Sequence, residues 1–360
     1  MKPLSGLRIL EFDGLGPVTF AGMVLADMGA DVLRLTRAPD AGVSVFEDVG
    51  GEILHRGRAA VPVNLKASTD QARVLDLVAS ADALIEGFRP GVMERLGLGP
   101  EACAERNPTL VYGRITGWGQ TGPKAAEVGH DINYIALSGA LSTLGEPDRP
   151  PRPPLNLIGD YGGGAMMLVA GVLAALLSAK QTGRGQVVDA AMTDGSSMLM
   201  SLFHALSARG LWTQARGSNL LDGGAPFYRC YACRDGKFIA VGALEPQFYA
   251  ALLGGVGLSP AEAPQYDRDG WPELHRRFEA LFASRDRDDW ASVFDGSDAC
   301  VTPVLSLAEA ASHPHNVARG VFPGGATPQP RAAPVFSGAS AAADHRAGQV
   351  TLDEAVALWR

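Results

Sequence analysis

Short apolar runs alternate with segments of helical periodicity along the first third of the chain. Residues 7–12 (LRILEF) and 30–35 (ADVLRL) each predict a strand, and residues 18–29 between them place their apolar side chains on one helical face. A strand, a helix and a second strand within about 30 residues form a βαβ unit, and such units build parallel sheets. The alternation continues with expected strands at 61–65, 81–88 and 109–119 and a helix near 69–80.

The middle of the chain is richer in helical pattern. Two helical segments lie between residues 130 and 180, separated by an extended proline-rich stretch at 146–156. The most apolar segment, residues 165–177, is shorter than the ~20 residues of a membrane-spanning helix, so we expect a buried core helix and no membrane span. A strand at 186–192 follows, and then a further helix over 196–206.

From about residue 210 the pattern becomes that of a second domain. An apolar hairpin with a turn at Asp235-Gly236 precedes two or three charged helices within residues 246–310. A stretch rich in alanine, glycine and proline at 320–350 is typical of a linker. An amphipathic helix at 352–360 is expected to dock back on the first domain.

These elements predict the α/β fold class, with a Rossmann-like parallel-sheet large domain and a smaller α+β domain. The length of 360 residues suits about two domains. We expect residues 1–200 and 330–360 in the large domain, linkers at 201–225 and 311–330, and the small domain at 226–310.

Composition narrows the class of protein. Apolar residues make up 46% of the chain, as in ordinary globular proteins, and the net charge of −8 argues against a nucleic-acid-binding surface. Four cysteines are too few for a disulfide scaffold, and Arg8 and Glu11 interrupt the apolar run near the N-terminus. We therefore expect a cytoplasmic protein without a signal peptide.

The first predicted turn does not carry a dinucleotide-binding fingerprint. Gly14 and Gly16 fill two glycine positions, but Thr19 occupies the third, and no acidic residue ends the second strand. Arg34 and Arg37 lie near that strand end instead and suit a phosphate group. Other cations of this region are either further phosphate partners or solvated charges: Arg56, Arg58, Lys66, Arg89 and Arg95.

The densest group of chemically useful residues spans two segments, residues 129–134 (GHDINY) and 156–164 (NLIGDYGGG). His130 beside Asp131 is either a base with an orienting carboxylate or a histidine satisfied within the core. Asp160 is either a helix cap or part of a site where backbone N–H groups face a developing oxyanion. Spacing alone does not choose between these interpretations.

Several long motifs in one order lead to a closer assignment. They are LSGLRILEFDGLGPVTFAGMVLADMGADVLRL, LIEGFRPGVMERLGLGP, GRITGWGQTGP, GHDINYIALSGAL, PPLNLIGDYGGGAMMLVAG, GQVVDAAMTDGSS and NLLDGGAPFY. Together they resemble the α-methylacyl-CoA racemase family, which belongs to the class III (family III) coenzyme A transferase superfamily. The resemblance covers residues 4–325 and implies that the large domain binds coenzyme A.

The resemblance implies a role for each residue of this group. His130 and Asp160 are similar to the two acid/base residues that exchange the proton on the carbon next to the thioester carbonyl. Asp131 and Glu245 would be supporting carboxylates, with Glu245 orienting the imidazole. The implied coenzyme A contacts are Arg37, Val63, Asn64, Leu65, Arg95, Gly129, Ile132, Asn133 and Tyr134, with Lys66 and Arg89 as further phosphate partners.

The implied reaction interconverts the (R)- and (S)-epimers of 2-methylacyl-CoA thioesters through an enolate, with an acid and a base on opposite faces of the α-carbon. We expect N–H groups of Gly162, Gly163 and the next glycine to stabilise the enolate oxygen. Coenzyme A is part of the substrate, so no separate cofactor is implied. The motifs predict the reaction but not which branched acyl group the substrate carries.

Members of this family are homodimers of interlocked subunits, which implies that Glu245 acts in trans. The alternative function is coenzyme A transfer between carboxylic acids, in which Asp160 attacks the thioester as a nucleophile. His130 distinguishes the two, because the transferases compared lack a histidine in this segment. A coenzyme A-binding module without catalysis is disfavoured, because both acid/base residues are present.

No metal site is expected. Cys230 and Cys233 form a C-x-x-C pair with no second pair, and their place in a strand would point the two sulfurs to opposite faces. His313 and His315 lie in an expected loop that lacks a carboxylate-rich neighbourhood.

Overall fold

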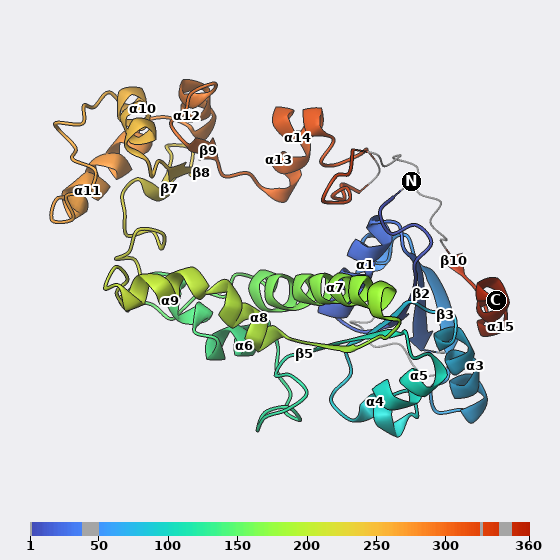
Figure 1. The fold of residues 1–360 in the computed structure, drawn as a ribbon. Coiled ribbons are helices and arrows are strands. Elements are labelled where there is room, and N and C mark those ends of the chain that lie inside the picture. Colours follow the sequence, from blue (N-terminus) through green and yellow to red (C-terminus); the bar gives the residue numbers. More distant parts are fainter. Residues whose placement is uncertain (1, 38–49, 325–326, 338–347) are drawn as a thin grey trace. The chain divides into compact units, whose positions relative to one another are not determined.

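The computed structural model describes residues 2–37, 50–324, 327–337 and 348–360. The chain forms two compact units (Figure 1). The first contains Met1–Leu141, Pro153–Ser201 and Arg331–Arg360, and the second contains Ser142–Arg152 and Leu202–Pro330. Part of the expected linker at 320–350 lies outside the described residues, namely 325–326 and 338–347.

The unit boundaries differ from the expected ones at the proline-rich stretch. Residues 142–152 were expected in the large domain, but they cluster with the second unit. The reason is Arg216, whose guanidinium donates hydrogen bonds to the carbonyls of Glu146 (3.2 Å), Ser142 (3.3 Å) and Arg149 (2.7 Å). The expected linkers at 201–225 and 311–330 also belong almost entirely to this unit.

The first unit is built on a parallel sheet, as the repeated βαβ pattern predicts. Its order within the described residues is β10-β3-β2-β1-β4-β5-β6, and every neighbouring pair is parallel. Successive strands are added on one side of β1 and then on the other, so the order reverses between β1 and β4. The strands are β1 (Arg8–Phe12), β2 (Asp31–Arg37), β3 (Ala59–Val63), β4 (Ala83–Glu86), β5 (Val111–Thr116), β6 (Val187–Ala191) and β10 (Gly348–Gln349).

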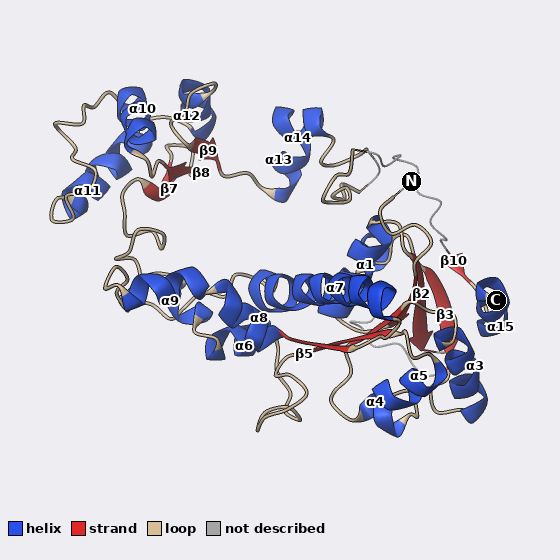
Figure 2. Cartoon of the chain, viewed as in Figure 1, coloured by secondary structure: helices blue, strands red, loops and turns tan. Residues whose placement is uncertain are grey.

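Helices cover both faces of this sheet (Figure 2). Helices α1 (Pro17–Asp27) and α7 (Met166–Thr182) bury their apolar side chains in one core. The opposite core is closed by α3 (Ser68–Val78), α5 (Pro100–Arg106) and α15 (Leu352–Trp359). The C-terminal helix therefore docks on the first unit as expected. Two short helices also belong to the first unit: α2 (Gly51–Leu54), whose Leu54 packs on the α1 side, and α4 (Val92–Arg95), whose Met93 lies in the opposite core.

A long apolar helix runs through the first unit. The π-helix η3 (Leu157–Ala165) continues into α7, and together Leu157–Thr182 is long and apolar enough to cross a membrane by length and composition alone. Leu168 and Val172 are fully buried in the core of the unit. We therefore assign this helix to the core, in line with the expectation from its sequence.

The remaining helices of the central segment are α6 (Asp131–Leu137), α8 (Met192–Leu199) and α9 (Ser201–Ala208), with a 3₁₀ turn at Ala140–Thr143. The one helix expected after residue 196 is thus two helices with a break at Met200. At this break the Ser201 hydroxyl donates to the carbonyl of Met198 at 2.5 Å, which competes with continued helix.

The second unit has a small antiparallel sheet with the order β7-β8-β9. Strands β7 (Tyr228–Ala232) and β8 (Phe238–Gly242) form the expected hairpin, whereas β9 (Val301–Pro303) was not expected. The sheet packs on an aromatic core that includes Tyr231, Phe278 and Phe282. The helices are α10 (Pro246–Val256), α11 (Trp271–Phe282), α12 (Arg287–Phe294), α13 (Leu307–Ser312) and α14 (Pro314–Arg319).

Of the C-x-x-C pair, Cys230 lies in β7 and Cys233 directly follows the end of this strand. Cys230 is exposed and Cys233 is buried, and both are free thiols. The residues that the structure describes contain no group of three or more histidine, cysteine or carboxylate side chains suited to a metal ion.

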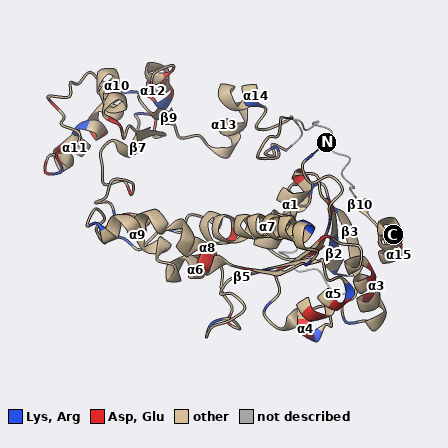
Figure 3. Cartoon of the chain, viewed as in Figure 1, with Lys and Arg blue, Asp and Glu red and all other residues tan. Residues whose placement is uncertain are grey.

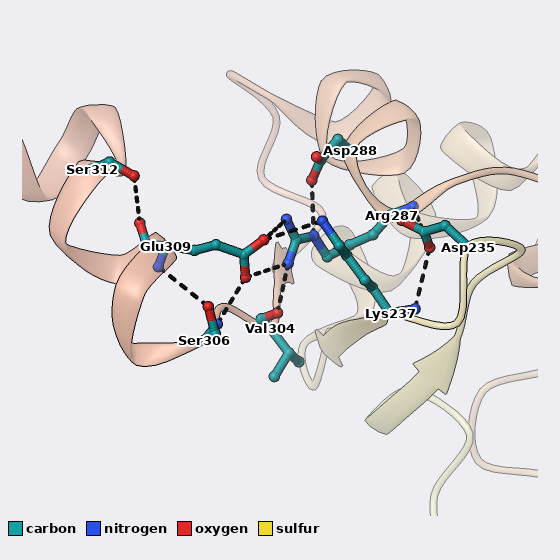
Figure 4. Close-up of polar contacts among 8 residues, drawn as sticks. All are labelled: Asp235, Lys237, Arg287, Asp288, Val304, Ser306, Glu309 and Ser312. Carbon is teal, nitrogen blue, oxygen red and sulfur yellow. Dashed lines mark hydrogen bonds and ion pairs between the residues drawn. The ribbon is translucent and has the colours of Figure 1, made fainter.

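A buried arginine ties α12 to α13 in the second unit (Figure 4). Arg287 is only 4% exposed and pairs with Glu309 at 2.9 Å and with Asp288 at 2.8 Å. Lys237 also pairs with Glu309 (3.1 Å), and the backbone N–H of Ser306 donates to the same carboxylate at 2.9 Å. These donors hold the pKa of Glu309 well below its ordinary value, with the Arg287 hydrogen bond as the largest cause.

Because this pKa is lower in the folded protein, the ionised carboxylate stabilises the fold above its ordinary pKa, and the effect is lost as pH falls. We expect Glu309→Gln to lower the melting temperature at pH 7, with a difference from wild type that narrows below about pH 4.5. Thermal unfolding at several pH values measures this. Glu279→Gln, on an exposed residue of α11 without an ion pair among the described residues, is the control. A difference that does not depend on pH would contradict the assignment.

Candidate active site

A cleft of about 630 Å³ opens in the first unit at the carboxyl ends of the central strands. Residues 14–19 follow β1, residues 87–90 follow β4 and residues 115–118 end β5, and all three segments line it. The cleft thus lies where the strand order reverses. In open parallel sheets this is the usual place for a ligand.

Asp160 reaches this cleft from the π-helix η3. Its backbone N–H donates to the Asp131 carboxylate at 2.7 Å, and its own carboxylate accepts from the Asn156 amide at 3.3 Å. Burial raises the pKa of Asp160, and the negative charge of Asp131 adds to this, whereas the Asn156 hydrogen bond and His130 act in the opposite direction. The carboxyl group is therefore adapted to hold a proton more readily than an exposed aspartate.

His130 reaches the same cleft from the N-cap position of α6. Its backbone N–H donates to the Asn133 side chain at 3.0 Å, which fixes the start of the helix. Its side chain is exposed rather than enclosed in the core. The interpretation as a satisfied core histidine is therefore wrong, and an imidazole and a carboxyl group share one cleft.

Tyr134 lines the cleft together with His130. Its hydroxyl donates to the carbonyl of Gly129, and its ring lies edge-on to Trp118 with centroids 4.8 Å apart. Burial raises the pKa of Tyr134 to about 12, so the phenol stays neutral at physiological pH. Gly117 must be glycine here, because a Cβ at this position would collide with the Tyr134 ring.

The three glycines after Asp160 differ from the open helix start that the sequence suggested. Each N–H of a π-helix donates to the carbonyl five residues earlier, so the N–H groups of Gly162 and Gly163 are used within η3. Neither glycine lines the cleft. Gly163 and Gly195 instead bring η3 and α8 into backbone contact, since a Cβ on Gly163 would lie 2.6 Å from the Ser196 nitrogen. The glycines are thus needed for packing.

The start of α1 lies against Asp160 in the cleft. Gly16 is the N-cap residue, with a φ of 70° that glycine adopts freely, and a Cβ there would lie 3.3 Å from the Asp160 carboxylate. Pro17 occupies the first helical position, and within the described residues no side chain caps the first turn. The positive end of the α1 dipole and its open N–H groups are therefore directed at the cleft.

Exposed cations and polar backbone follow the same edge of the sheet away from the cleft. Arg37 ends β2 and is paired in register with Val63, which ends β3. A turn stabilised by the hydrogen bond from the Lys66 N–H to the Asn64 side chain (3.1 Å) comes next. Of the other expected contacts, Arg89 lines the cleft, and Arg95 is exposed on α4.

Comparison with known proteins now gives the family. Residues 4–351 match CoA-transferase family III. Alpha-methylacyl-CoA racemase of Mus musculus is 47% identical over 337 residues, which cover 93% of this chain and 86% of the relative. The enzyme of the same name from Homo sapiens is 45% identical over 320 residues, 89% of this chain and 82% of the relative. The chain belongs to CoA-transferase family III.

The fold agrees with this family. A crystal structure of a CAIB/BAIF family protein from Brucella suis has a TM-score of 0.81 with this chain at 24% identity, and it covers 99% of this chain and 98% of that chain. A mostly parallel α/β sheet with a smaller antiparallel sheet is therefore the architecture of this family III chain.

Some cations of the family III chain have structural roles instead of facing a ligand. Arg34 pairs with Asp13 at 2.9 Å, Arg56 with Asp27 at 2.6 Å, and Arg58 with Glu11 in the fully buried interior. These three are therefore not the free phosphate partners that the sequence left open. A βαβ pattern places cations near strand ends but does not show which carboxylates they meet.

The sequence also missed two residues of the site. Asn156 donates to the Asp160 carboxylate, a contact that the motif alone does not predict. Gly16, which belongs to the incomplete dinucleotide fingerprint, lies against that carboxylate. The spacing of four residues between Asn156 and Asp160 in a helical segment was the available signal.

Glu245 lies in the second unit of this family III chain. It is the N-cap residue of α10, directly after Leu244, and its side chain is exposed. Ile132 and Asn133 are likewise exposed on α6 and do not line the cleft, whereas Gly129 does.

The contact between Gly163 and Gly195 gives a stability prediction. A Cβ on Gly195 would collide with the carbonyl oxygen of Gly163, and backbone cannot move aside as a flexible side chain can. We expect Gly195→Ala to lower the free energy of unfolding by about 1–3 kcal/mol.

Chemical denaturation compares this variant with Gly254→Ala on α10, where no atom lies within 4 Å of the new Cβ. That control should be more stable than wild type by about 0.5–1 kcal/mol, because alanine favours helix. Equal effects of the two substitutions would contradict the proposed backbone contact.

Proposed function

We propose that this protein interconverts the (R)- and (S)-epimers of 2-methylacyl-CoA thioesters. The observation that supports this most directly is the shared cleft of His130 and Asp160, two proton-exchanging groups carried by different elements. The family membership supports a coenzyme A thioester as the substrate. The mouse and human relatives, which are named alpha-methylacyl-CoA racemases, support the reaction itself.

Epimerisation requires one group to remove the α-proton while another delivers a proton to the opposite face. An imidazole exchanges protons near neutral pH and serves in either role. The raised pKa of Asp160 brings its carboxyl group nearer to that range, so it can also hold or release the proton. Because both groups alternate between acid and base, the reaction runs in both directions.

The enolate oxygen needs hydrogen-bond donors, since the α-proton of a thioester is too weakly acidic for an unassisted carboxylate. With Gly162 and Gly163 inside η3, the donors we propose are backbone N–H groups at the open start of α1, which lines the cleft. The dipole of α1 favours negative charge at this end of the helix.

The coenzyme A part of the substrate extends from the cleft along the edge of the sheet in this proposal. Arg37, Lys66, Arg89 and Arg95 supply positive charge for its phosphates. Val63, Asn64 and Leu65 supply backbone and side-chain contacts at the end of β3. Coenzyme A arrives with the substrate, so the proposal includes no separate cofactor.

The alternative is coenzyme A transfer through attack of Asp160 on the thioester carbonyl. His130 favours the racemase, because a transferase of this type needs one nucleophilic carboxylate and no second proton-exchanging group. A carboxylate also attacks a thioester best when it is ionised and exposed. Burial raises the pKa of Asp160 and so disfavours its ionised form.

We expect His130→Ala and Asp160→Ala each to reduce epimerisation by at least about 100-fold while the protein stays folded. One epimer of a 2-methylacyl-CoA is incubated in deuterated water, and optical purity and α-deuterium are measured. Wild type should racemise the thioester with α-deuterium incorporation. His204→Ala, on an exposed residue of α9, is the control and should retain activity.

Transfer of coenzyme A to an added carboxylic acid without α-exchange would reject the proposal in favour of the transferase. Near-normal turnover in either site variant would reject the two-base mechanism.

We also propose that the protein is a homodimer. Helices α6, η3, α7 and α8 contact one another and expose large apolar side chains to solvent, and α7 and α9 carry almost no charge along their length (Figure 3). Exposed apolar groups on adjoining helices are typical of an interface with another chain. The residues concerned are Ile132, Leu137, Leu157, Met166, Met198 and Leu199.

If Glu245 acts in trans, two impaired variants should complement each other. A mixed dimer of one His130→Ala chain and one Glu245→Gln chain then has one site with both groups intact, so about half of the wild-type activity returns. Co-expressed chains with different tags give the mixed dimer for the assay. Mixed dimers no more active than the two parent variants would show that Glu245 does not act on the partner's site.

A further inference from the structure

The backbone just before Glu245 is held by an unusual set of side-chain hydrogen bonds. The Gln265 amide donates to the carbonyls of both Ala243 (3.0 Å) and Leu244 (2.8 Å). The Tyr266 hydroxyl donates to the Leu244 carbonyl at 2.7 Å. Three bonds from two adjacent residues thus converge on the two peptide groups that precede Glu245.

These donors are themselves fixed in place. The Trp271 indole donates to the Gln265 carbonyl at 2.9 Å, and the Tyr266 ring lies edge-on to Phe227 with centroids 5.6 Å apart. Trp271 and Phe227 belong to the core of the second unit. The loop between α10 and α11 is therefore anchored to the core. Its hydrogen bonds to Ala243 and Leu244 hold that backbone in place.

On the other side, Glu245 begins a helix. The N–H of Tyr249 donates to the Glu245 carbonyl at 2.9 Å, and Pro246 occupies the first helical position. The Ala243 N–H donates to the carbonyl of Phe227 at 2.9 Å. The Glu245 backbone is thus held from both directions, while its side chain is exposed and free of any hydrogen bond among the described residues.

We propose that Gln265 and Tyr266 are positioning residues for the Glu245 carboxylate in epimerisation. The proposal rests on the function proposed above, in which Glu245 orients the His130 imidazole. A carboxylate on an exposed N-cap has few contacts of its own, so the direction of its Cα–Cβ bond is set by the preceding peptide groups. Gln265 and Tyr266 fix those groups, and neither residue touches the substrate in this role.

A purely structural role is the competing explanation, and a double-mutant cycle separates the two. We expect Gln265→Leu to lower kcat by about 10- to 100-fold, because small misplacements of a catalytic group are costly, with KM changed by less than about 3-fold. In a Glu245→Gln background the same substitution should change kcat by less than about 2-fold, since there is no carboxylate left to position. A structural role predicts equal losses in both backgrounds.

Tyr266→Phe is the milder second variant, because it removes one hydrogen bond and keeps the ring against Phe227. We expect a loss in kcat of about 5-fold, again absent in the Glu245→Gln background. If Gln265→Leu does not fold, the cycle with Tyr266→Phe tests the proposal instead. Asn316→Leu is the matched control: it removes an amide bond to the Ala310 carbonyl (2.8 Å) elsewhere in this unit and should leave kcat unchanged.

Hydrogen exchange followed by mass spectrometry provides a readout without activity. Peptides covering residues 240–250 should exchange faster in Gln265→Leu than in wild type and be unchanged in Asn316→Leu. Additive losses in the cycle, or unchanged exchange, would overturn this inference and leave the racemase function intact. A wild type that neither racemises nor exchanges the α-proton would overturn both.

Discussion

The hydrogen bond from the Asp160 N–H to the Asp131 carboxylate is the interaction on which the site depends. It joins the start of α6 to the first turn of η3, two segments about thirty residues apart, and so brings His130 and Asp160 to one cleft. The same carboxylate also raises the pKa of Asp160 by its charge. One buried group thus fixes the geometry of the pair and adjusts the proton affinity of one member.

The sheet and most helices could be predicted from the sequence, because periodicity and turn residues are local. The π-helix at Leu157–Ala165 could not, since its hydrogen-bond register depends on how closely η3 approaches α8 through Gly163 and Gly195. For the same reason the sequence does not distinguish glycines that donate to an oxyanion from glycines that pack closely: it shows the absence of side chains but not which neighbour requires it. The placement of residues 142–152 likewise depends on the distant Arg216.

The two units hold their candidate site residues in place in different ways. In the first unit His130 and Asp160 lie in the cleft at the strand-order reversal. In the second unit Glu245 stands at an exposed helix start whose backbone is held by side chains of a neighbouring loop. The packing of α6 and η3 positions His130 and Asp160, whereas hydrogen bonds to main-chain carbonyls fix the backbone that precedes Glu245. Periodicity reveals the first kind of support and gives no sign of the second.

A single carboxylate such as Asp160 serves two chemistries in principle, and its surroundings choose between them. Attack on a thioester carbonyl requires an ionised oxygen with a free approach to that carbon. Proton exchange at the neighbouring carbon requires a carboxyl group that also holds a proton, and a second group on the opposite face. Desolvation of Asp160 disfavours the ionised form, and His130 supplies the second group. Both features of the cleft therefore favour the proposed proton exchange at the α-carbon over attack on the carbonyl carbon.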